Sequence, residues 1–446
     1  MASQTVDASY TDYPLPGGGP PAAAEIEESV EPVHGRWGLF LLGAGLLLIA
    51  LNLRIGVASI GPVLTDIRES LGLSATTASL LTTIPVFTFG AFAFLTPVLT
   101  RRIGMHRILG ITVFVLAVGI GLRMHPSLLA LFAGTVLVGA AIAVGNVLMP
   151  AAIKQDFSHR AGLMMGLYST ALFIGAAIAS GVTAPLVAEL SMNWRTGLAM
   201  WSIPAVLALL VWIPQMRRRP GQLKTGRDVA DAPSERGEPP FRAILTDPVA
   251  IAVTALMGLQ STSYYVTLTW APTILQDAGV TASTAGLLLA YSAFPGILSA
   301  LITPAIAGRI RLGWMPVVVA AMLIGAAYAG LAIHPAGGAW AWMTLLGLGQ
   351  GASISLSLTY IVWRSPDTHH TGHLSTMSQG FGYLFAGLGP IGIGAVYSLT
   401  GEWTIPFVLL GVFLAAQLTA GVYASRPVFI CVRTRAHTAD REQISL

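Results

Sequence analysis

The sequence predicts an all-α membrane protein whose twelve transmembrane helices form two pseudo-symmetric six-helix bundles. Three observations lead to this fold class. Charged residues make up 10% of the chain against the usual ~25%, hydrophobic residues make up 54%, and the mean hydropathy is +0.71. Apolar runs long enough to cross a bilayer as helices recur along the chain. One long hydrophilic connection divides those runs into two sets of six.

Each element follows from the composition of its segment. Residues 1–36 are rich in Pro, Gly, Ala and Glu and lack the charged-then-apolar order of a signal peptide, so we expect a disordered cytoplasmic tail. We expect bundles over 37–214 and 248–424, a Pro-bearing cytoplasmic linker over 215–247 and a cytoplasmic tail over 425–446. The expected spans, of which the third and sixth are short, lie near 37–63, 76–99, 108–124, 127–152, 162–187, 197–214, 248–274, 282–307, 314–333, 338–362, 375–397 and 403–424.

The distribution of Lys and Arg predicts the orientation. With the N-terminus inside, twenty of the 24 Lys and Arg residues fall in cytoplasmic segments. Arg68, Arg123 and Arg195 fall in outside loops, and Arg54 lies within a span. By the positive-inside rule, both termini of this multi-pass protein are expected in the cytoplasm, with the spans in the plasma (inner) membrane. The basic run within the linker also suits contact with anionic lipid.

The two halves resemble each other at an offset of about 209 residues, as two repeats would. Met192-Asn193-Trp194-Arg195 before the sixth span matches Gly401-Glu402-Trp403-Thr404 before the twelfth. Parallel repeats of this kind are one plan of membrane transporters, in which the substrate site lies between the halves near the midplane.

Arg54 is the residue that says most about function. It lies about 25 Å along the first span, at 1.5 Å per residue, and it cannot lose its proton to escape hydrocarbon. Inserting such a charge costs at least roughly 2.5–3.5 kcal/mol, so a span that keeps it usually turns it toward a polar cavity. We therefore expect Arg54 to be a fixed positive charge in a transport cavity. The alternative is an arginine that pairs with backbone carbonyls or extends to the far interface.

Several stretches resemble known families. The plan of six plus six spans around a central cytoplasmic loop resembles the major facilitator superfamily, as does part of the loop Pro97–Arg107. This resemblance implies the major facilitator fold and a gating loop whose residues here are Arg101, Arg102, Gly104 and Arg107. Arg101 stands where the common pattern has an aspartate, which puts the charge-relay latch of that aspartate in doubt.

A narrower resemblance is to the cyanate/2-nitroimidazole transporter family. It is carried by Leu51-Asn52-Leu53-Arg54 and by stretches of the later spans, namely Gly258-Leu259-Gln260-Ser261, Tyr264-Tyr265, Trp270–Leu275, Gly347–Gly351, Leu374–Gln379 and Gly382-Tyr383, with Asp156–Leu163 before the fifth span. The resemblance covers about residues 37–424 and implies a small anionic or strongly polarised solute.

The seventh span offers polar partners at the depth of Arg54. Gln260, Tyr264 and Thr267 share one helical face with Ala271, and uncharged donors beside a guanidinium suit a small planar anion. Their alternative role is hydrogen bonding that holds the helices of the bundle together. Gln350 in the tenth span and Gln379 in the eleventh are open to the same two interpretations. Asn146, Tyr168, Tyr291 and Tyr383 are weaker candidates.

The sequence therefore predicts a secondary active or facilitative transporter that works by rocker-switch alternating access. A proton-driven drug efflux carrier is the alternative, although no Asp, Glu, Lys or His lies well inside any expected span. A membrane-embedded enzyme or a receptor fits less well, because neither interfacial catalytic groups nor a soluble output domain is evident. We expect no enzyme activity, no cofactor and, with Cys431 as the only cysteine, no Cys-based metal site. The expected partners are the small-molecule solute and the lipid bilayer, without nucleic acid, and we expect a monomer.

Overall fold

The computed structural model describes residues 36–217 and 241–430, and within these ranges the chain forms helices and short connections without any strand. The first half, called the N-half here, holds α1 Arg36–Ala58, η1 Gly61–Val63, α2 Leu64–Leu71, α3 Ala75–Ala93, α4 Thr96–Ile103, α5 Met105–Leu122, α6 Leu128–Asp156, η2 Ser158–Arg160, α7 Ala161–Glu189, α8 Trp194–Ala199 and α9 Ser202–Met216. The second half, the C-half, holds α10 Phe241–Leu245, α11 Pro248–Asp277, α12 Ala282–Ala307, α13 Met315–Ile333, α14 Ala339–Trp363, α15 Thr368–Thr400 and α16 Thr404–Ala424.

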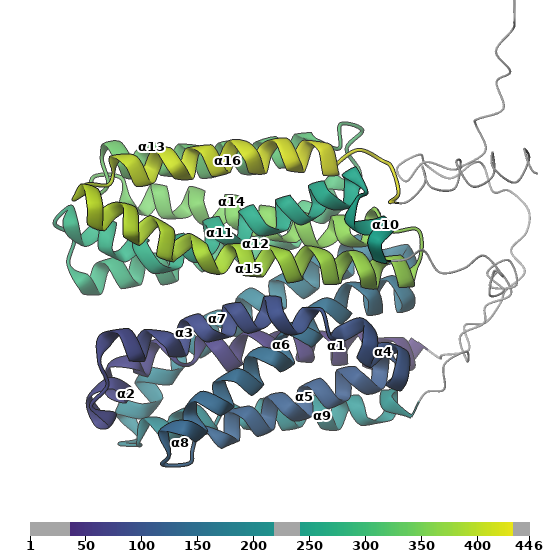
Figure 1. The fold of residues 1–446 in the computed structure, drawn as a ribbon, viewed down its shortest axis with the longest axis horizontal. Helices are drawn as coiled ribbons and strands as arrows, with labels where there is room; N and C mark the ends of the chain where they lie inside the picture. Colours follow the sequence, from purple (N-terminus) through teal and green to yellow (C-terminus); the bar gives the residue numbers. More distant parts are fainter. Residues whose placement is uncertain (1–35, 218–240, 431–446) are drawn as a thin grey trace, which may run out of the picture.

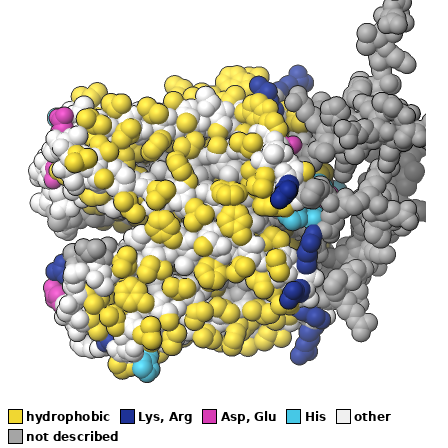
Figure 2. Space-filling model, in the orientation of Figure 1, with side chains coloured by type: hydrophobic (Ala, Val, Ile, Leu, Met, Phe, Trp, Pro, Cys, Tyr) yellow, Lys and Arg dark blue, Asp and Glu magenta, His cyan; other side chains and the backbone are white. Residues whose placement is uncertain are grey.

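The two halves lie side by side as separate bundles of roughly parallel and antiparallel helices (Figure 1). We call the end at which α9 stops and α10 begins the linker end, on the right of Figure 1, and the opposite end the far end. Lys and Arg side chains gather at the linker end of the face shown in Figure 2, while apolar side chains cover the helical flanks. This is the surface that a membrane-spanning bundle presents to lipid.

Eleven described helical segments are long and apolar enough to span a membrane. A twelfth span is a bent pair, in which Leu80–Ala93 and Thr96–Ile103 meet at 56°. Pro97 stands in the first turn of α4, where a backbone N–H has no partner within the helix. The missing N–H of proline therefore costs no hydrogen bond there, and the sequence favours the start of a new helix at this break. The all-α class with twelve spans is therefore confirmed.

Some predicted boundaries were wrong. The sixth span is not short, because α8 and α9 together run from Trp194 to Met216. The eleventh begins at Thr368, where Asp367 caps the helix and carries it through a polar first turn. A short helix, α10, lies inside the predicted linker, most of which falls outside the described residues, as do the tails 1–35 and 431–446. The first residues of the predicted C-terminal tail pack back on the C-half, since Ile430 is buried and its backbone N–H donates to the Arg364 carbonyl.

Glycines allow the two halves to approach closely toward the linker end. A Cβ at Gly166 of α7 would lie 2.9 Å from the Leu301 carbonyl oxygen of α12. A Cβ at Gly90 of α3 would lie 2.8 Å from the Gly380 carbonyl oxygen of α15. Backbone contacts of this kind need residues without a side chain. At the far end the outline of the molecule is notched between the halves (Figure 2). The halves are thus joined at the linker end and open toward the far end.

Candidate substrate site

Arg54 lies in the last part of α1, at the interface between the two halves. Its side chain is half-buried, and Nη1 donates a 3.3 Å hydrogen bond to the Tyr265 hydroxyl of α11 in the C-half. Among the described residues, no carboxylate forms an ion pair with this guanidinium. A buried arginine normally has a carboxylate partner, because an unpaired charge away from water is costly. Arg54 therefore presents most of its hydrogen-bonding capacity to the space between the halves.

Aromatic side chains surround the Arg54 guanidinium. Tyr264 and Tyr383, beside Tyr265, lie close enough to interact with it electrostatically. The rings of Tyr264 and Tyr265 meet edge to face, with centroids 5.5 Å apart. These three tyrosines come from α11 and α15 of the C-half, so Arg54 of the N-half faces their phenol rings across the interface between the halves.

The predicted polar face of α11 is divided in the structure. Tyr264 is half-buried beside Arg54, whereas Gln260 is buried and donates to the Met257 carbonyl at 3.2 Å and the Ser261 hydroxyl at 2.7 Å. The hydroxyl that bonds Arg54 belongs to Tyr265, which the prediction did not select. Two adjacent tyrosines point about 100° apart on a helix, and only the rotation of α11 decides which one meets the arginine.

Gln350 connects two helices of the C-half. Its Nε2 donates to the Thr267 hydroxyl at 2.9 Å, and the Ser263 carbonyl lies 3.4 Å away. This contact has the geometry of the alternative interpretation, in which polar residues hold the bundle together. A role for Gln350 or Gln260 in substrate binding stays a prediction.

Gln379 connects the two halves on the linker side of Arg54. Its Nε2 donates to the Asn146 backbone carbonyl of α6 at 2.7 Å and to the Ser375 hydroxyl at 2.9 Å. Pro150 stands four residues after Asn146 and has no N–H, so the Asn146 carbonyl lacks its helical donor. Gln379 supplies that donor from the other half. Gln379 therefore links the two halves by a hydrogen bond, and direct substrate contact stays a prediction.

The predicted gating loop lies at the linker end between α4 and α5. Gly104 has a φ of 90°, a backbone conformation that favours glycine, and it separates the two helices. Arg107 donates from Nε to the Met216 carbonyl at the end of α9, at 3.4 Å. Arg101 and Arg102 are exposed beside it. The loop is placed where a gate would be, and its gating role stays a prediction.

Arg123 and Asp156 are among the buried ionisable side chains that the sequence did not predict. Arg123, expected in an outside loop, is fully buried, and its Nη1 donates to the Gly56 carbonyl at 2.7 Å, close to where α1 ends. The Asp156 carboxylate at the end of α6 is fully buried, with His106 Nε2 3.7 Å away. Both residues are at helix ends, as the sequence indicated, but neighbouring helices cover them. The signal in the sequence was only a charge next to a long apolar run.

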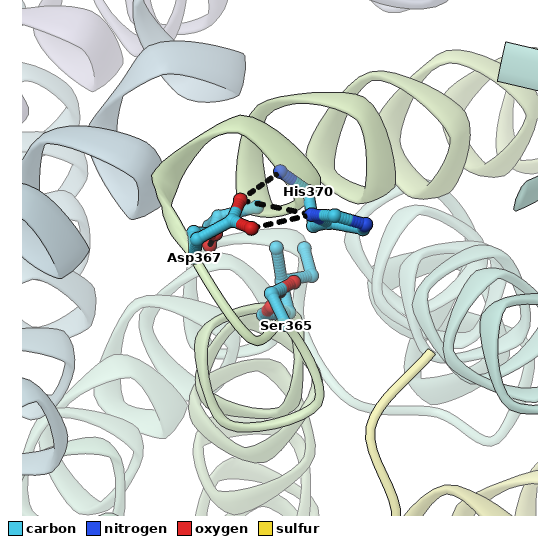
Figure 3. Close-up of polar contacts among 5 residues, drawn as sticks. Ser365, Asp367 and His370 are labelled. Atoms are coloured by element: carbon cyan, nitrogen blue, oxygen red, sulfur yellow. Dashed lines mark hydrogen bonds and ion pairs between the residues drawn. The ribbon is translucent and has the colours of Figure 1, made fainter. Parts of the chain in front are cut away.

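The linker end also holds a capped helix start (Figure 3). The Asp367 carboxylate accepts from the His370 backbone N–H at 2.8 Å and contacts the His370 ring Nδ1 at 2.8 Å, while the Ser365 hydroxyl donates to the Ile361 carbonyl. Burial opposes ionisation, but the hydrogen bonds from the His370 ring and backbone outweigh it, so the pKa of Asp367 is lowered to about 2. Nearby, Lys154 Nζ of α6 lies 3.4 Å from the Val362 carbonyl near the end of α14. Among the described residues, no cluster of three His, Cys, Asp or Glu side chains could hold a metal ion.

Comparison with known proteins identifies the family. The sequence profile of the Major Facilitator Superfamily matches residues 46–390. The chain belongs to this superfamily. The superfamily assignment agrees with the twelve spans and the two six-helix halves, and the chain is a multi-pass membrane transporter of this class.

Relatives cover nearly the whole chain. An uncharacterized transporter, YycB, of Bacillus subtilis (strain 168) is 38% identical over 397 residues, which is 88% of this chain and 95% of the relative. The 2-nitroimidazole transporter of Escherichia coli (strain K12) is 35% identical, over 86% and 95% of the two chains. The cyanate transport protein CynX of the same organism is 31% identical, over 80% and 90%.

A solved structure shows the same fold. The major facilitator superfamily proton:xylose symporter XylE, bound to 6-bromo-6-deoxy-D-glucose, matches with a TM-score of 0.68 at 13% identity. The match covers 87% of this chain and 94% of the symporter. At this identity the likeness concerns the arrangement of helices alone.

Proposed function

We propose that this transporter moves a small anionic or strongly polarised solute, cyanate-like or nitroimidazole-like, across the plasma membrane, and that Arg54 binds its negative group. The observation that carries this proposal is the half-buried guanidinium of Arg54, which lies between the halves with a tyrosine hydroxyl as its bonded partner. The planar fork of arginine binds a carboxylate, nitro group or similar planar acceptor with two parallel hydrogen bonds. The names of two relatives, a 2-nitroimidazole and a cyanate transporter, fit that chemistry.

Alternating access by rocking of the halves is the proposed mechanism. The cross-half contacts Gln379–Asn146 and Lys154–Val362 lie on the linker side of Arg54, and the far end is notched. A solute entering through the notch would reach Arg54 and meet the closed linker end beyond it. Rocking would then break these contacts and open the linker end. The charge distribution supports a cytoplasmic linker end, with both termini on that side.

The test is exchange of labelled solute in proteoliposomes, with cyanate and 2-nitroimidazole as probes. We expect Arg54→Gln to abolish exchange, and Arg54→Lys to fail almost as badly because a point charge cannot reproduce the bidentate fork. Arg195→Gln is the matched control, since Arg195 is also half-buried but lies at the far end, away from Arg54, where it stacks on Trp194. Normal exchange by Arg54→Gln, at normal protein yield, would contradict the proposal.

A further inference from the structure

The positive charge of Arg54 has no acidic counterpart inside the spans. Among the described residues, every Asp and Glu lies in the short helix α2 or at or beyond the end of a helix. The hydrogen-bond partner of Arg54, the Tyr265 hydroxyl, is neutral and accepts from a single N–H of the guanidinium. The empty site between the halves therefore carries a net positive charge.

A second buried arginine adds to this charge. Arg123 is fully buried, and its Nη1 donates to the carbonyl of Gly56, which lies in the same turn of α1 as Arg54. The Nε and Nη2 atoms of Arg123 are buried without a hydrogen-bond partner among the described residues, and no described carboxylate forms an ion pair with them. Two positive charges repel each other more strongly away from water, so Arg123 makes the charge of Arg54 more costly to bury.

Rocking between the two open forms passes through a form that is closed at both ends. In the present structure Arg54 is half-buried and the far end is notched, so the guanidinium keeps part of its contact with water. Closing the far end over an empty site would remove that water. A buried charge without a counter-charge lowers the population of such a form by about 100-fold or more. A bound anion supplies the missing charge, so the loaded protein can close.

Resting on the function proposed above, we infer that this protein is an exchanger of small monovalent anions, whose halves pass through the closed form only with an anion on Arg54. One anion crosses in each direction per cycle, so the cycle moves no net charge. A neutral solute would leave the positive charge uncompensated, so the form that is carried is the anion. The Tyr265 hydroxyl offsets only part of the charge of the empty site.

The test measures the efflux of radiolabelled cyanate from proteoliposomes that contain the full chain. The outside medium holds either unlabelled cyanate or a polymeric sulfonate, whose chains are too large to be carried. Valinomycin, with equal potassium on both sides, holds the membrane potential at zero, and protein-free liposomes give the leak that is subtracted. We expect efflux into cyanate to be at least about tenfold faster than efflux into the sulfonate, because only cyanate lets the protein return loaded.

Tyr265→Phe tests whether the charge of the empty site sets the slow step. The substitution removes the hydroxyl that bonds Arg54 in the empty site, while a bound anion still pairs with the guanidinium. Net efflux should fall more than exchange, so the ratio of exchange to net efflux should rise by about threefold or more. Tyr360→Phe is the matched control, because Tyr360 is also buried and its hydroxyl donates at 3.3 Å to the Gly313 carbonyl within the C-half. Its ratio should stay at the wild-type value.

The wild-type rates alone decide the inference, so a variant that fails to fold leaves the test intact. Equal efflux into the two media, above the leak, overturns the exchange and leaves anion transport through Arg54 standing. Efflux at the level of the leak into both media overturns the proposed function as well. If folded Tyr265→Phe leaves the ratio unchanged or lowers it, the charge of the empty site does not set the slow step and the inference is wrong.

Discussion

The hydrogen bond from Gln379 to Asn146 should control how often the linker end opens. The Asn146 carbonyl has no donor within α6 because Pro150, four residues later, has no N–H. Gln379 donates to this carbonyl instead, and it can do so only while the halves are closed at this end. Gln379→Leu keeps the side-chain volume and removes the donor. The second bond of Gln379, to Ser375, lies within α15 and does not depend on closure.

The size of the effect follows from what the substitution leaves behind. A buried carbonyl without a donor costs about 1–3 kcal/mol, and water can satisfy it once the linker end opens. The closed state should therefore lose about 1–3 kcal/mol relative to the open state, which is a shift of about 5- to 150-fold in their ratio. Gln379 Oε1 and Asn146 Nδ2 are buried without a hydrogen-bond partner among the described residues. These two atoms therefore make no other hydrogen bond that could compensate for the loss of the Gln379–Asn146 contact.

The assay is double electron–electron resonance between spin labels at positions 160 and 309, with Cys431 replaced by Ser. Arg160 precedes α7 and Arg309 follows α12, both are exposed at the linker end, and one belongs to each half. Gln379→Leu should increase the population at long distance. The matched control is Gln417→Leu, because Gln417 is a buried glutamine that donates to Ser353 within the C-half. An unchanged distance distribution in Gln379→Leu, or an equal change in Gln417→Leu, would refute the reasoning.

Three further predictions concern packing, the capped helix start and coupling. A Cβ at Gly175 of α7 would overlap the Leu51 carbonyl of α1, so Gly175→Ala should destabilise the folded protein by about 1–3 kcal/mol. Gly181 has open space around it, so Gly181→Ala should not destabilise the protein. Thermal unfolding that ranks the two variants in the reverse order would contradict this prediction. Asp367→Ala should cost about 0.5–2 kcal/mol and Asp367→Asn less. The pKa of Asp367 is about 2 in the folded protein, below its ordinary value of 3.8. The ionised carboxyl therefore contributes stability that is complete above about pH 4 and is lost as the pH falls toward about 2. If the wild type instead became more stable relative to Asp367→Asn on acidification, the prediction would be contradicted. Exchange of an anion in liposomes should persist when Asp66, exposed on α2, and Asp247, the cap of α11, are both replaced by Asn. If Asp66→Asn, Asp247→Asn or Asp156→Asn abolished proton-driven accumulation but left counterflow intact, the protein would carry its own proton and the efflux alternative would be the better account.

The fold was predictable because hydrocarbon leaves few options. A backbone in lipid must satisfy its own hydrogen bonds, so each apolar run of membrane length becomes a helix. Boundaries were less predictable where polar residues continue a helix. The first residues of α15, Thr368-His369-His370, are polar, and the helix starts there because Asp367 caps it. Hydropathy alone does not contain that information.

The candidate site was predictable only in part. Arg54 could be selected as a site residue because a charge within an apolar run is unusual whatever the packing of the helices. Tyr265 was missed in favour of Tyr264 as its hydrogen-bond partner because the rotation of α11 about its own axis depends on the neighbouring helices. Arg123 and Asp156 were missed because burial at a helix end is decided by what packs over it. Tertiary contacts supply each of these facts.

The central claim is that Arg54 binds the negative group of the solute between the halves. The most direct measurement is crystallography of the protein soaked with 4-bromobenzoate, using anomalous scattering to locate the bromine. The account predicts a carboxylate held by both outer nitrogens of Arg54 and no bromine peak at this position in Arg54→Gln crystals. A bromine peak elsewhere, with Arg54 still bonded to the Tyr265 hydroxyl, would contradict it, as would an unchanged peak in Arg54→Gln.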